Sequence, residues 1–548
     1  MTTLSRRTLL LGTAAVAAGP LLGGCSKEPA GSGTAQNLDS VAGLLPSHHE
    51  FTGSVKPDIL GTRPVPDGYL RYPATLVDAI TEKPAASGRE ISAMTPVWGP
   101  APPGIDRSAY LRAVGAELGA PVNFVVQDGG TYGDKLNAMF GARDVPEVLC
   151  VPGWEVDKIP RFAEAATALF TDLTDHLQAE RVSAYPMLSS FPTGAWRHAV
   201  WNQRLFAIPN PSDGPFPYAM FTRKDLLDER GLAVPGNLDD LLAMAKQVTD
   251  PKRRVWAFSD IFAMLQMYHR VPGAKGGWRL TAGKTPEFKY ETAEYRRALE
   301  VMAGIYRDGL VHPDLVASKG ADQNQLFASG GILFAQAGVG YWQPAQAENQ
   351  KITPKLNIQP LPVFAVGGGD PLVWGAAEPI SYTFLKAGLP KDRVEELLRV
   401  INWCSAPLGT QEAQLRDYGV AGKHHTVTPD GPVKTDLAFK EIVNQYYFIS
   451  GRNPAIGPFP DTPNYVRDVL TYSNETVKYL EQDPWDGLKL EMPVKFASYR
   501  VAAEEKFTDV LRGRRPMSDF DALVKEWRDN GGEEARALMA KALTDSGR

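Results

Sequence analysis

Alternating apolar and polar positions predict a regular α/β unit in the first well-patterned part of the chain. Short apolar, β-branched runs at 90–100, 121–126 and 146–151 are typical of strands. Between these runs, residues 108–119 and 131–140 carry apolar side chains at helical spacing. This order predicts a parallel sheet, and ligands of such sheets bind at the carboxyl ends of the strands.

Large aromatic and acidic side chains follow the three predicted strands. Trp98 lies in the Pro/Gly turn that ends the first run, Asp128 and Trp154 follow the second and third runs, and Tyr132 lies at the start of the second helix. Because the carboxyl ends of parallel strands meet at one edge of a sheet, these residues are candidate ligand contacts. The alternative is that the aromatic rings belong to the core of the unit.

The later pattern predicts a second lobe that interrupts the first. Residues 358–364 and 374–384 are typical of strands. Segments rich in Gly and Pro near 209–217 and 361–374 are placed where the chain would cross between two lobes. Such segments can absorb the backbone change of a hinged closure.

The first 33 residues have the pattern of an export signal. A positive start with Arg6 and Arg7 precedes a short apolar run and small residues. The paired arginines resemble the twin-arginine variant, and the four residues that end in Cys25 resemble a bacterial lipobox. An uncleaved membrane anchor is the alternative, but Pro20 interrupts the run, which is shorter than the ~20 residues of a span. We predict a palmitate-bearing lipoprotein anchored through Cys25 to the extracellular face of the cell membrane.

Composition excludes several classes of function. The chain of 548 residues is 43% hydrophobic and 22% charged, which is typical of a globular protein with two or more cores. A net charge of −5, without a basic run interleaved with aromatic residues, argues against a nucleic-acid partner. No Cys/His cluster has metal-ligand spacing, so we predict no metal and no cofactor. Cys150 and Cys404 are either two buried thiols or one disulfide.

Several motifs resemble those of family 1 extracellular solute-binding proteins. Residues 134–149 are similar to the family's helix, Gly turn and Pro-acidic-aliphatic strand start, with Glu147 where Asp is commoner. The segment 204–227 is similar to a strand followed by a Tyr-Arg-Lys-Asp-Leu-Leu signature, with Thr222 in place of the usual aromatic residue. Further similar segments follow in the family's order at 231–242, 330–342, 418–426 and 512–527.

The resemblance implies a fold and a domain organisation. The fold is an α/β, two-lobe, periplasmic-binding-protein-like (type II) fold, with two parallel-type sheets flanked by helices and joined by hinge crossings. The predicted parts are a signal peptide at 1–25, a flexible tether and extended arm at 26–88, a first lobe of 89–210 with 372–430, and a second lobe of 211–371 with 431–548.

The resemblance also implies a sugar site between the lobes, in which Trp342 corresponds to a tryptophan that stacks on sugar. Flat aromatic faces suit the C–H faces of pyranose rings, while charged side chains bind hydroxyl groups. Trp256, Trp403 and Trp527 are assigned to packing, whereas Trp196 and Trp278 share the Gly, Pro or turn neighbours of the candidate contacts. The predicted ligand-binding residues are Trp98, Asp128, Tyr132, Trp154, Asp213, Tyr218, Arg223, Trp342, Trp374 and Glu378.

The implied function is a monomeric binding protein of an ABC importer, which captures a carbohydrate, an oligosaccharide, and delivers it to the permease subunits in the membrane. We predict no enzyme, because no nucleophile elbow, metalloprotease motif or phosphate loop occurs and no motif isolates a pair of catalytic carboxylates. Two alternatives stay open. One is a secreted glycan-active enzyme, and the other is a peptide-binding or adhesion lipoprotein.

Overall fold

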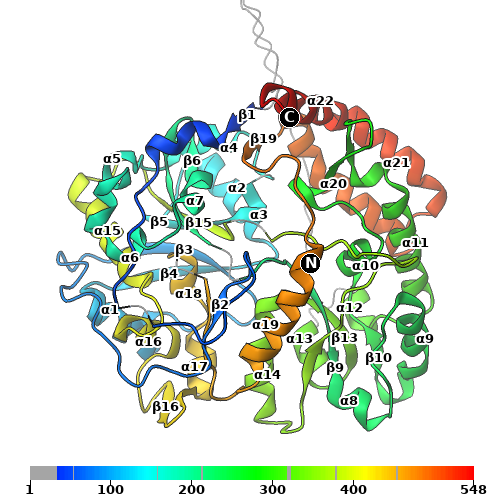
Figure 1. Ribbon diagram of the computed structural model, residues 1–548, viewed down its shortest axis with the longest axis horizontal. Coiled ribbons are helices and arrows are strands. Elements are labelled where there is room, and N and C mark those ends of the chain that lie inside the picture. Colours follow the sequence, from blue (N-terminus) through cyan, green and yellow to red (C-terminus); the bar gives the residue numbers. More distant parts are fainter. Residues whose placement is uncertain are drawn as a thin grey trace, which may run out of the picture.

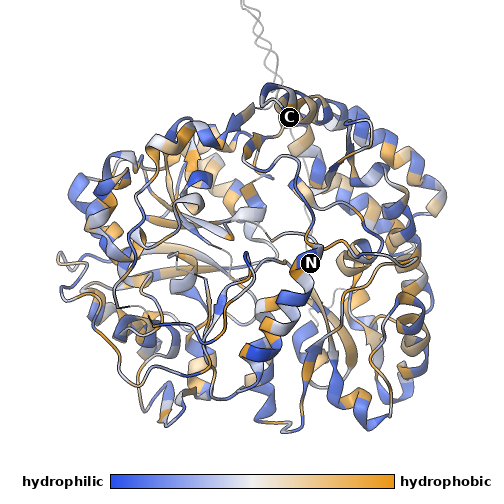
Figure 2. Ribbon diagram, viewed as in Figure 1, coloured by the Kyte–Doolittle hydropathy of each residue, from blue (hydrophilic) through white to orange (hydrophobic). Residues whose placement is uncertain are grey.

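The computed structural model describes residues 34–53, 55–156, 158–211, 214–317, 322–376, 379–451 and 454–548. Within them the chain forms two lobes, each built on its own sheet and its own cluster of buried apolar side chains (Figure 1). Apolar residues follow the central strands, and polar residues are frequent on the outer helices (Figure 2). The two-lobe α/β fold predicted from the sequence is therefore confirmed.

The first lobe, on the left in Figure 1, has a five-stranded sheet in the order β4-β3-β5-β15-β8. Helix α1 begins where the Ser108 hydroxyl accepts a hydrogen bond from the backbone N–H of Leu111, and it ends at Gly119, whose φ of 86° suits glycine. The main elements are β3 (Ile91–Val97), α1 (Ala109–Leu118), β4 (Val122–Asp128), α2 (Tyr132–Ala142), β5 (Val148–Pro152), β8 (Ala207–Asn210), β15 (Ser381–Leu385) and α15 (Lys391–Cys404).

The second lobe has a four-stranded sheet in the order β10-β13-β9-β14. Helix α11 begins after Thr292, whose hydroxyl accepts a hydrogen bond from the backbone N–H of Tyr295. In the core of this lobe the rings of Phe288 and Trp527 stack with their centroids 4.8 Å apart. The main elements are β9 (Ala219–Arg223), β10 (Trp256–Phe258), α10 (Phe262–Tyr268), α11 (Ala293–Arg307), β13 (Ile332–Ala337), α14 (Trp342–Gln350), β14 (Ile358–Pro360), α20 (Val494–Leu511) and α21 (Phe520–Trp527).

Both sheets are mixed, whereas two parallel-type sheets were predicted. β3 runs parallel to β4 and β5, but β15 is antiparallel to both of its neighbours. In the second sheet β10 and β13 are parallel, while β9 is antiparallel to β13 and β14. The two reversed strands are the first strands that form after the chain crosses between lobes. When the chain arrives directly from the other lobe, its strand begins at the sheet edge that faces that lobe. The strand therefore runs away from that edge.

The crossings lie against one another. The N–H of Ala376 donates to the carbonyl of Pro215, and the N–H of Ile380 donates to that of Asn210. A third passage follows later, because Tyr446 and Ile449 belong to the first lobe's core, whereas Trp485 belongs to the second. The predicted domain limits stay a prediction, but this packing brings part of the 431–548 segment to the first lobe.

The start of the described chain also joins the two lobes. Strand β1 (Thr34–Asn37) pairs antiparallel with β19 (Leu488–Glu491), and the following turn of helix buries Val41 in the first lobe's core. Residues further along the predicted arm form only short pairings, such as β2 (Asp67–Gly68) with β18 (Ala455–Ile456). Among the described residues, no helix combines the length and the apolar character needed to cross a membrane.

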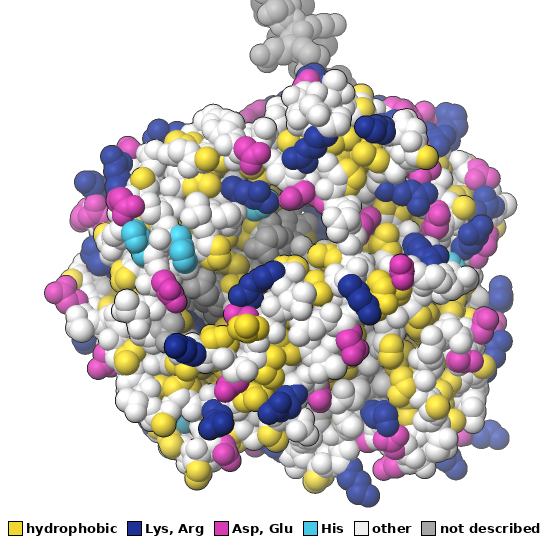
Figure 3. Space-filling view, in the orientation of Figure 1, with side chains coloured by type: hydrophobic (Ala, Val, Ile, Leu, Met, Phe, Trp, Pro, Cys, Tyr) yellow, Lys and Arg dark blue, Asp and Glu magenta, His cyan; other side chains and the backbone are white. Residues whose placement is uncertain are grey.

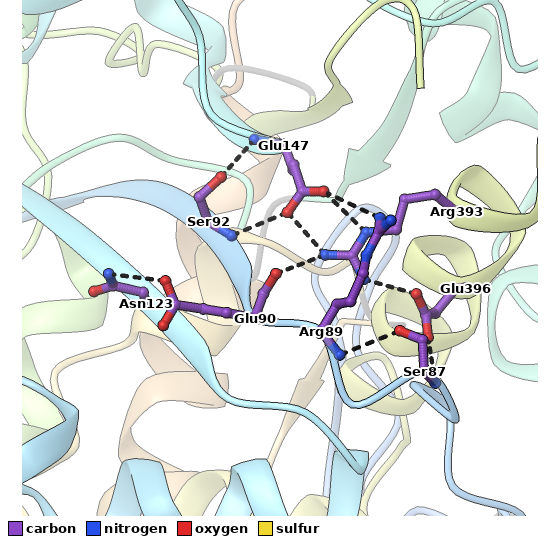
Figure 4. Close-up of polar contacts among 8 residues, drawn as sticks. All are labelled: Ser87, Arg89, Glu90, Ser92, Asn123, Glu147, Arg393 and Glu396. Atoms are coloured by element: carbon purple, nitrogen blue, oxygen red, sulfur yellow. Dashed lines mark hydrogen bonds and ion pairs between the residues drawn. The ribbon is translucent and has the colours of Figure 1, made fainter. Parts of the chain in front are cut away.

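A buried ion network closes the end of the first sheet that lies opposite the carboxyl edge (Figure 4). Arg393 is 1% exposed and donates to both carboxylate oxygens of Glu147, to Glu396 and to the carbonyl of Glu90. Burial raises the pKa of Glu147, but Arg393 and Ser92 more than offset it, so this pKa lies below its ordinary value. The glutamate in place of the family's commoner aspartate thus has a partner for its carboxylate.

Candidate ligand-binding site

An aromatic cluster stands at the carboxyl edge of the first sheet. β3 and β5 end just before Trp98 and Trp154, whose ring centroids lie 6.0 Å apart at an interplanar angle of 51°. Trp98 is 54% exposed, an unusual value for so large an apolar side chain. The predicted strand ends therefore bring these two tryptophans together, as the sequence pattern indicated.

A third segment completes this cluster. Phe448, at the end of α18 (Gln445–Phe448), lies 5.7 Å from Trp98 and 5.1 Å from Tyr447. The side-chain amide of Asn210 donates to the carbonyl of Tyr447 and holds the segment against the sheet. We call Trp98, Trp154, Tyr447 and Phe448 the aromatic platform. The sequence analysis missed Tyr447 and Phe448, for which the run of three consecutive aromatic residues was the available signal.

The turn after β4 supports Trp98. Gly129 lies under the indole, because a Cβ atom at this position would come within 2.2 Å of Trp98 Cε2. Asp128 is exposed, and its Oδ1 accepts a hydrogen bond of 3.0 Å from the N–H of Gly130. The turn thus leaves both the ring and the carboxylate at the open edge of the sheet.

A charged pair follows Trp154. Glu155 is 7% exposed and accepts a 3.1 Å hydrogen bond from the ammonium of Lys158. Glu155 lies close to Gly133 near the start of α2, where a Cβ atom would come within 2.4 Å of its Oε2. Its negative charge therefore has a cation beside it and a helix N-terminus close by.

The edge of the second sheet carries a different set of side chains. Tyr218 precedes β9 and is 38% exposed, and burial of the rest of the residue raises the pKa of its hydroxyl. Asp260 follows β10 and accepts hydrogen bonds from the hydroxyl of Tyr306 and the N–H of Phe262. The molecule is hollowed near the middle of the face shown in Figure 3, between the two lobes.

Residues 101–388 match the family model of the bacterial extracellular solute-binding protein. This stretch is more than half of the 548 residues. The chain belongs to this family.

Relatives of this solute-binding protein are distant in sequence. The polygalacturonan/rhamnogalacturonan-binding protein YtcQ of Bacillus subtilis (strain 168) is 20% identical over 433 residues, which are 73% of this chain and 81% of YtcQ. Among solved structures, the alginate-binding protein AlgQ2 without calcium ion has a TM-score of 0.60 at 16% identity, covering 83% of this chain and 98% of AlgQ2.

Two further solved structures share the fold. The Streptococcus pneumoniae substrate-binding protein FusA in complex with kestose has a TM-score of 0.59 at 14% identity, covering 84% of this chain and 99% of FusA. The N-glycan transport protein NgtS of the same species, in complex with Man1GlcNAc, has a TM-score of 0.60 at 14% identity, covering 83% and 99%. At such identities the likeness shows that the fold of this solute-binding protein is the two-lobe one.

Tyr132 lies in the core, although we predicted a ligand contact. Its side chain is 1% exposed, and its hydroxyl donates to the carbonyls of Cys150 at 2.8 Å and Met94 at 3.3 Å. Burial holds the pKa of this hydroxyl well above its ordinary value. Tyr132 therefore ties α2 to two strands, and its placement argues against a ligand role.

Arg223 is buried as well. It is 3% exposed, pairs with Asp225 at 2.7 Å and donates to the carbonyls of Phe327 and Ala328. These partners occupy the planar donor face of the guanidinium. The motif that suggested a ligand contact thus joins β9 to the end of helix α13 (Gln323–Ala328), which precedes β13.

Trp342 and Trp374 both pack against the protein, but Trp342 is buried more deeply than Trp374. Trp342 is 2% exposed, and its Nε1 donates to the carbonyl of Ile358 at 2.7 Å. Trp374 is half-buried, lies against Gly273 and donates from Nε1 to the carbonyl of Val271 at 2.8 Å. The burial of Trp342 argues against sugar stacking, whereas Trp374 keeps some exposed surface at the return crossing.

The other predicted residues lie either outside the described part of the chain or in buried positions. Asp213, Glu378 and Cys25 lie outside the described residues. Trp403 and Trp527 are buried as predicted, but Trp196 and Trp278 are fully buried despite their turn neighbours. Cys150 and Cys404 are both free and buried, and burial raises the pKa of each thiol. Over the part of the chain that the structure describes, no group of His, Cys, Asp and Glu side chains could hold a metal ion.

Proposed function

We propose that this protein binds a carbohydrate, an oligosaccharide, between its two lobes and delivers it to the permease of an ABC importer. The observation that carries the proposal is the exposed ring of Trp98, which the other members of the aromatic platform support at the carboxyl edge of the first sheet. Aromatic faces pack against the C–H groups of sugar rings, and open α/β sheets bind ligands at this edge. Several of the relatives bind polysaccharides or oligosaccharides, which supports the same class of ligand.

The polar share of the site is proposed to come from both lobes. Asp128 offers an exposed carboxylate beside Trp98, and Tyr218 offers a half-exposed hydroxyl from the second lobe. Asp213, Trp374 and Glu378 belong to the segments that cross between the lobes and complete the proposed set. A ligand that touches both lobes stabilises their closed arrangement and shifts the population toward it.

Anchoring and partners follow from the start of the chain. Lipid on Cys25 would hold the protein on the extracellular face of the cell membrane through a tether of residues 26–33, since Thr34 already pairs with Glu491 in the β1–β19 sheet. The permease subunits would then distinguish the filled from the empty protein by shape. The binding protein itself works as a monomer in this proposal.

A glycan-active enzyme is the less favoured alternative. Glycoside hydrolysis needs two carboxylates across the scissile bond. At the platform, Asp128 is exposed but Glu155 is buried and paired with Lys158. This arrangement favours binding over hydrolysis.

Titration of the purified protein with a panel of oligosaccharides tests the proposal. We expect saturable binding with a change in tryptophan fluorescence, and recovery of the intact sugar afterwards. Release of new reducing ends would favour the enzyme, and the absence of binding to every sugar in the panel would contradict the carbohydrate proposal.

A further inference from the structure

The carboxylate of Asp128 lies next to the exposed ring of Trp98. Asp128 is the last residue of β4, and it pairs in register with Val97, the residue before Trp98. The N–H of Gly129 donates to the carbonyl of Val97 at 2.8 Å, and a Cβ atom on Gly129 would come within 2.2 Å of the indole. A sugar ring that covers Trp98 therefore meets this carboxylate at its edge.

The charge of Asp128 has no partner. Its Oδ1 accepts a hydrogen bond of 3.0 Å from the N–H of Gly130, and no Lys, Arg or His side chain among the described residues lies within ion-pair distance of the carboxylate. The side chain is exposed, so its second oxygen is open to a ligand. Such a carboxylate accepts strong hydrogen bonds from hydroxyl or ammonium groups, and it repels a second carboxylate.

The other charges at the ligand edges of both sheets do not supply a cation for a sugar acid. In the described chain, the last residue of β3, β4, β5, β10 and β13 and the four residues after each include no Lys, Arg or His. They include Asp128, Glu155 and Asp260. Lys158 pairs with Glu155 at 3.1 Å, whereas Asp260 accepts a hydrogen bond from the hydroxyl of Tyr306 and pairs with no described cation. Each lobe thus presents one carboxylate that no described cation balances.

We infer that Asp128 makes the site select against acidic sugars, so that the ligand is a neutral or amino oligosaccharide whose ring at Trp98 donates hydroxyl or ammonium groups to this carboxylate. This inference rests on the proposed function and names the substrate class of its site. A uronate ring on Trp98 would instead place a second anion beside Asp128. Closure of the lobes removes water from the site, and the lower dielectric strengthens that repulsion.

The test compares matched sugars of different charge on the mature protein. The probes are tetrasaccharides of glucose, mannose and galactose, the same sugars oxidised at C6 to uronates, and the corresponding 2-amino sugars. Calorimetric titration should show that, for each backbone that binds, the neutral or amino form binds about 10-fold or more tightly than the uronate, the value of one charge-assisted hydrogen bond. This preference should weaken as salt increases.

Two variants separate Asp128 from the general charge of the protein. Asp128→Asn keeps the shape of the side chain and the oxygen that bonds Gly130, but it removes the charge. It should reduce the preference over the uronate to about threefold or less, and it should weaken binding of the amino form more than that of the neutral form. Glu117→Gln removes the same charge from an exposed position near the end of α1, away from the ligand edge, and should leave the preference unchanged.

The outcomes distinguish this inference from the proposed function. Equal or tighter binding of a uronate, a preference that survives in Asp128→Asn, or a preference that is lost equally in Glu117→Gln would overturn the role of Asp128 and leave carbohydrate binding intact. Binding of no oligosaccharide would overturn both.

Discussion

Replacement of Trp98 by alanine should weaken ligand binding and leave the fold almost unchanged. A tryptophan side chain buries about 150–250 Å² when it is fully covered. Since Trp98 is 54% exposed, about 100 Å² of its surface remains for a ligand to cover. At about 25 cal/mol per Å² this area is worth about 2–3 kcal/mol, or about 30- to 150-fold in Kd.

Trp342→Ala is the matched control, because it removes the same side chain from a position that is 2% exposed. It should lower the free energy of unfolding by about 3–5 kcal/mol and leave the carbonyl of Ile358 without its hydrogen bond. Its effect on affinity at a temperature where it is folded should be small.

Calorimetric titration with the tightest-binding oligosaccharide and thermal unfolding, measured on both variants, give the comparison. The reasoning would be refuted if Trp98→Ala unfolded several degrees earlier and kept its affinity while Trp342→Ala lost binding alone.

Three other changes test separate parts of the structure. Arg223→Met should lower the free energy of unfolding by about 3–5 kcal/mol, because Asp225 would stay buried without its partner, and Arg223→Met with Asp225→Leu should recover part of the loss; a selective loss of affinity would restore the ligand role. Burial, with a smaller effect of Asp483, raises the pKa of Glu481 to about 7 from 4.5, so the contribution of this group to stability should be complete below pH 4.5 and fall by at most about 3 kcal/mol as pH rises to about 7. Glu481→Gln should remove this contribution, seen as the difference between the variant and the natural protein in pH-resolved unfolding. Gly451→Ala places a Cβ atom 2.2 Å from the carbonyl of Pro209 and should destabilise the third crossing, seen as a lower Tm.

Local signals explain which parts of the site the sequence predicted. Trp98 and Trp154 were found because each directly follows a strand, and the parallel order of these strands is a consequence of the alternation of strands and helices. The ends of β3 and β5 then bring the two rings together whatever the rest of the chain does. The position of each tryptophan directly after its strand was sufficient to predict that the two rings lie close together.

Burial of a turn residue depends on distant parts of the chain, which local pattern does not report. Trp342 follows a short turn, but β14 and Phe221 enclose it. Arg223 lies at the end of strand β9, yet its donors are taken by Asp225 and by the end of helix α13. The same limit hid Phe448, which lies 350 positions after Trp98 and reaches it only through the third passage between the lobes.

The reversed strands show a related limit. A short apolar run has the same pattern in either direction, so the run at 374–384 predicted a strand there without its orientation, and β9 was noticed only as part of a family-like segment. Their direction is set by the side from which the chain enters each sheet. Topology, rather than local preference, decides this feature.

The most direct test of the central claim is small-angle scattering of the mature protein, with and without a saturating amount of the tightest-binding oligosaccharide. A ligand held between Trp98 of the first lobe and Tyr218 of the second should draw the lobes together, so the radius of gyration should decrease when the sugar is bound. An unchanged radius of gyration at full saturation, with Tyr218→Ala binding as tightly as the natural protein, would contradict capture by closure of two lobes.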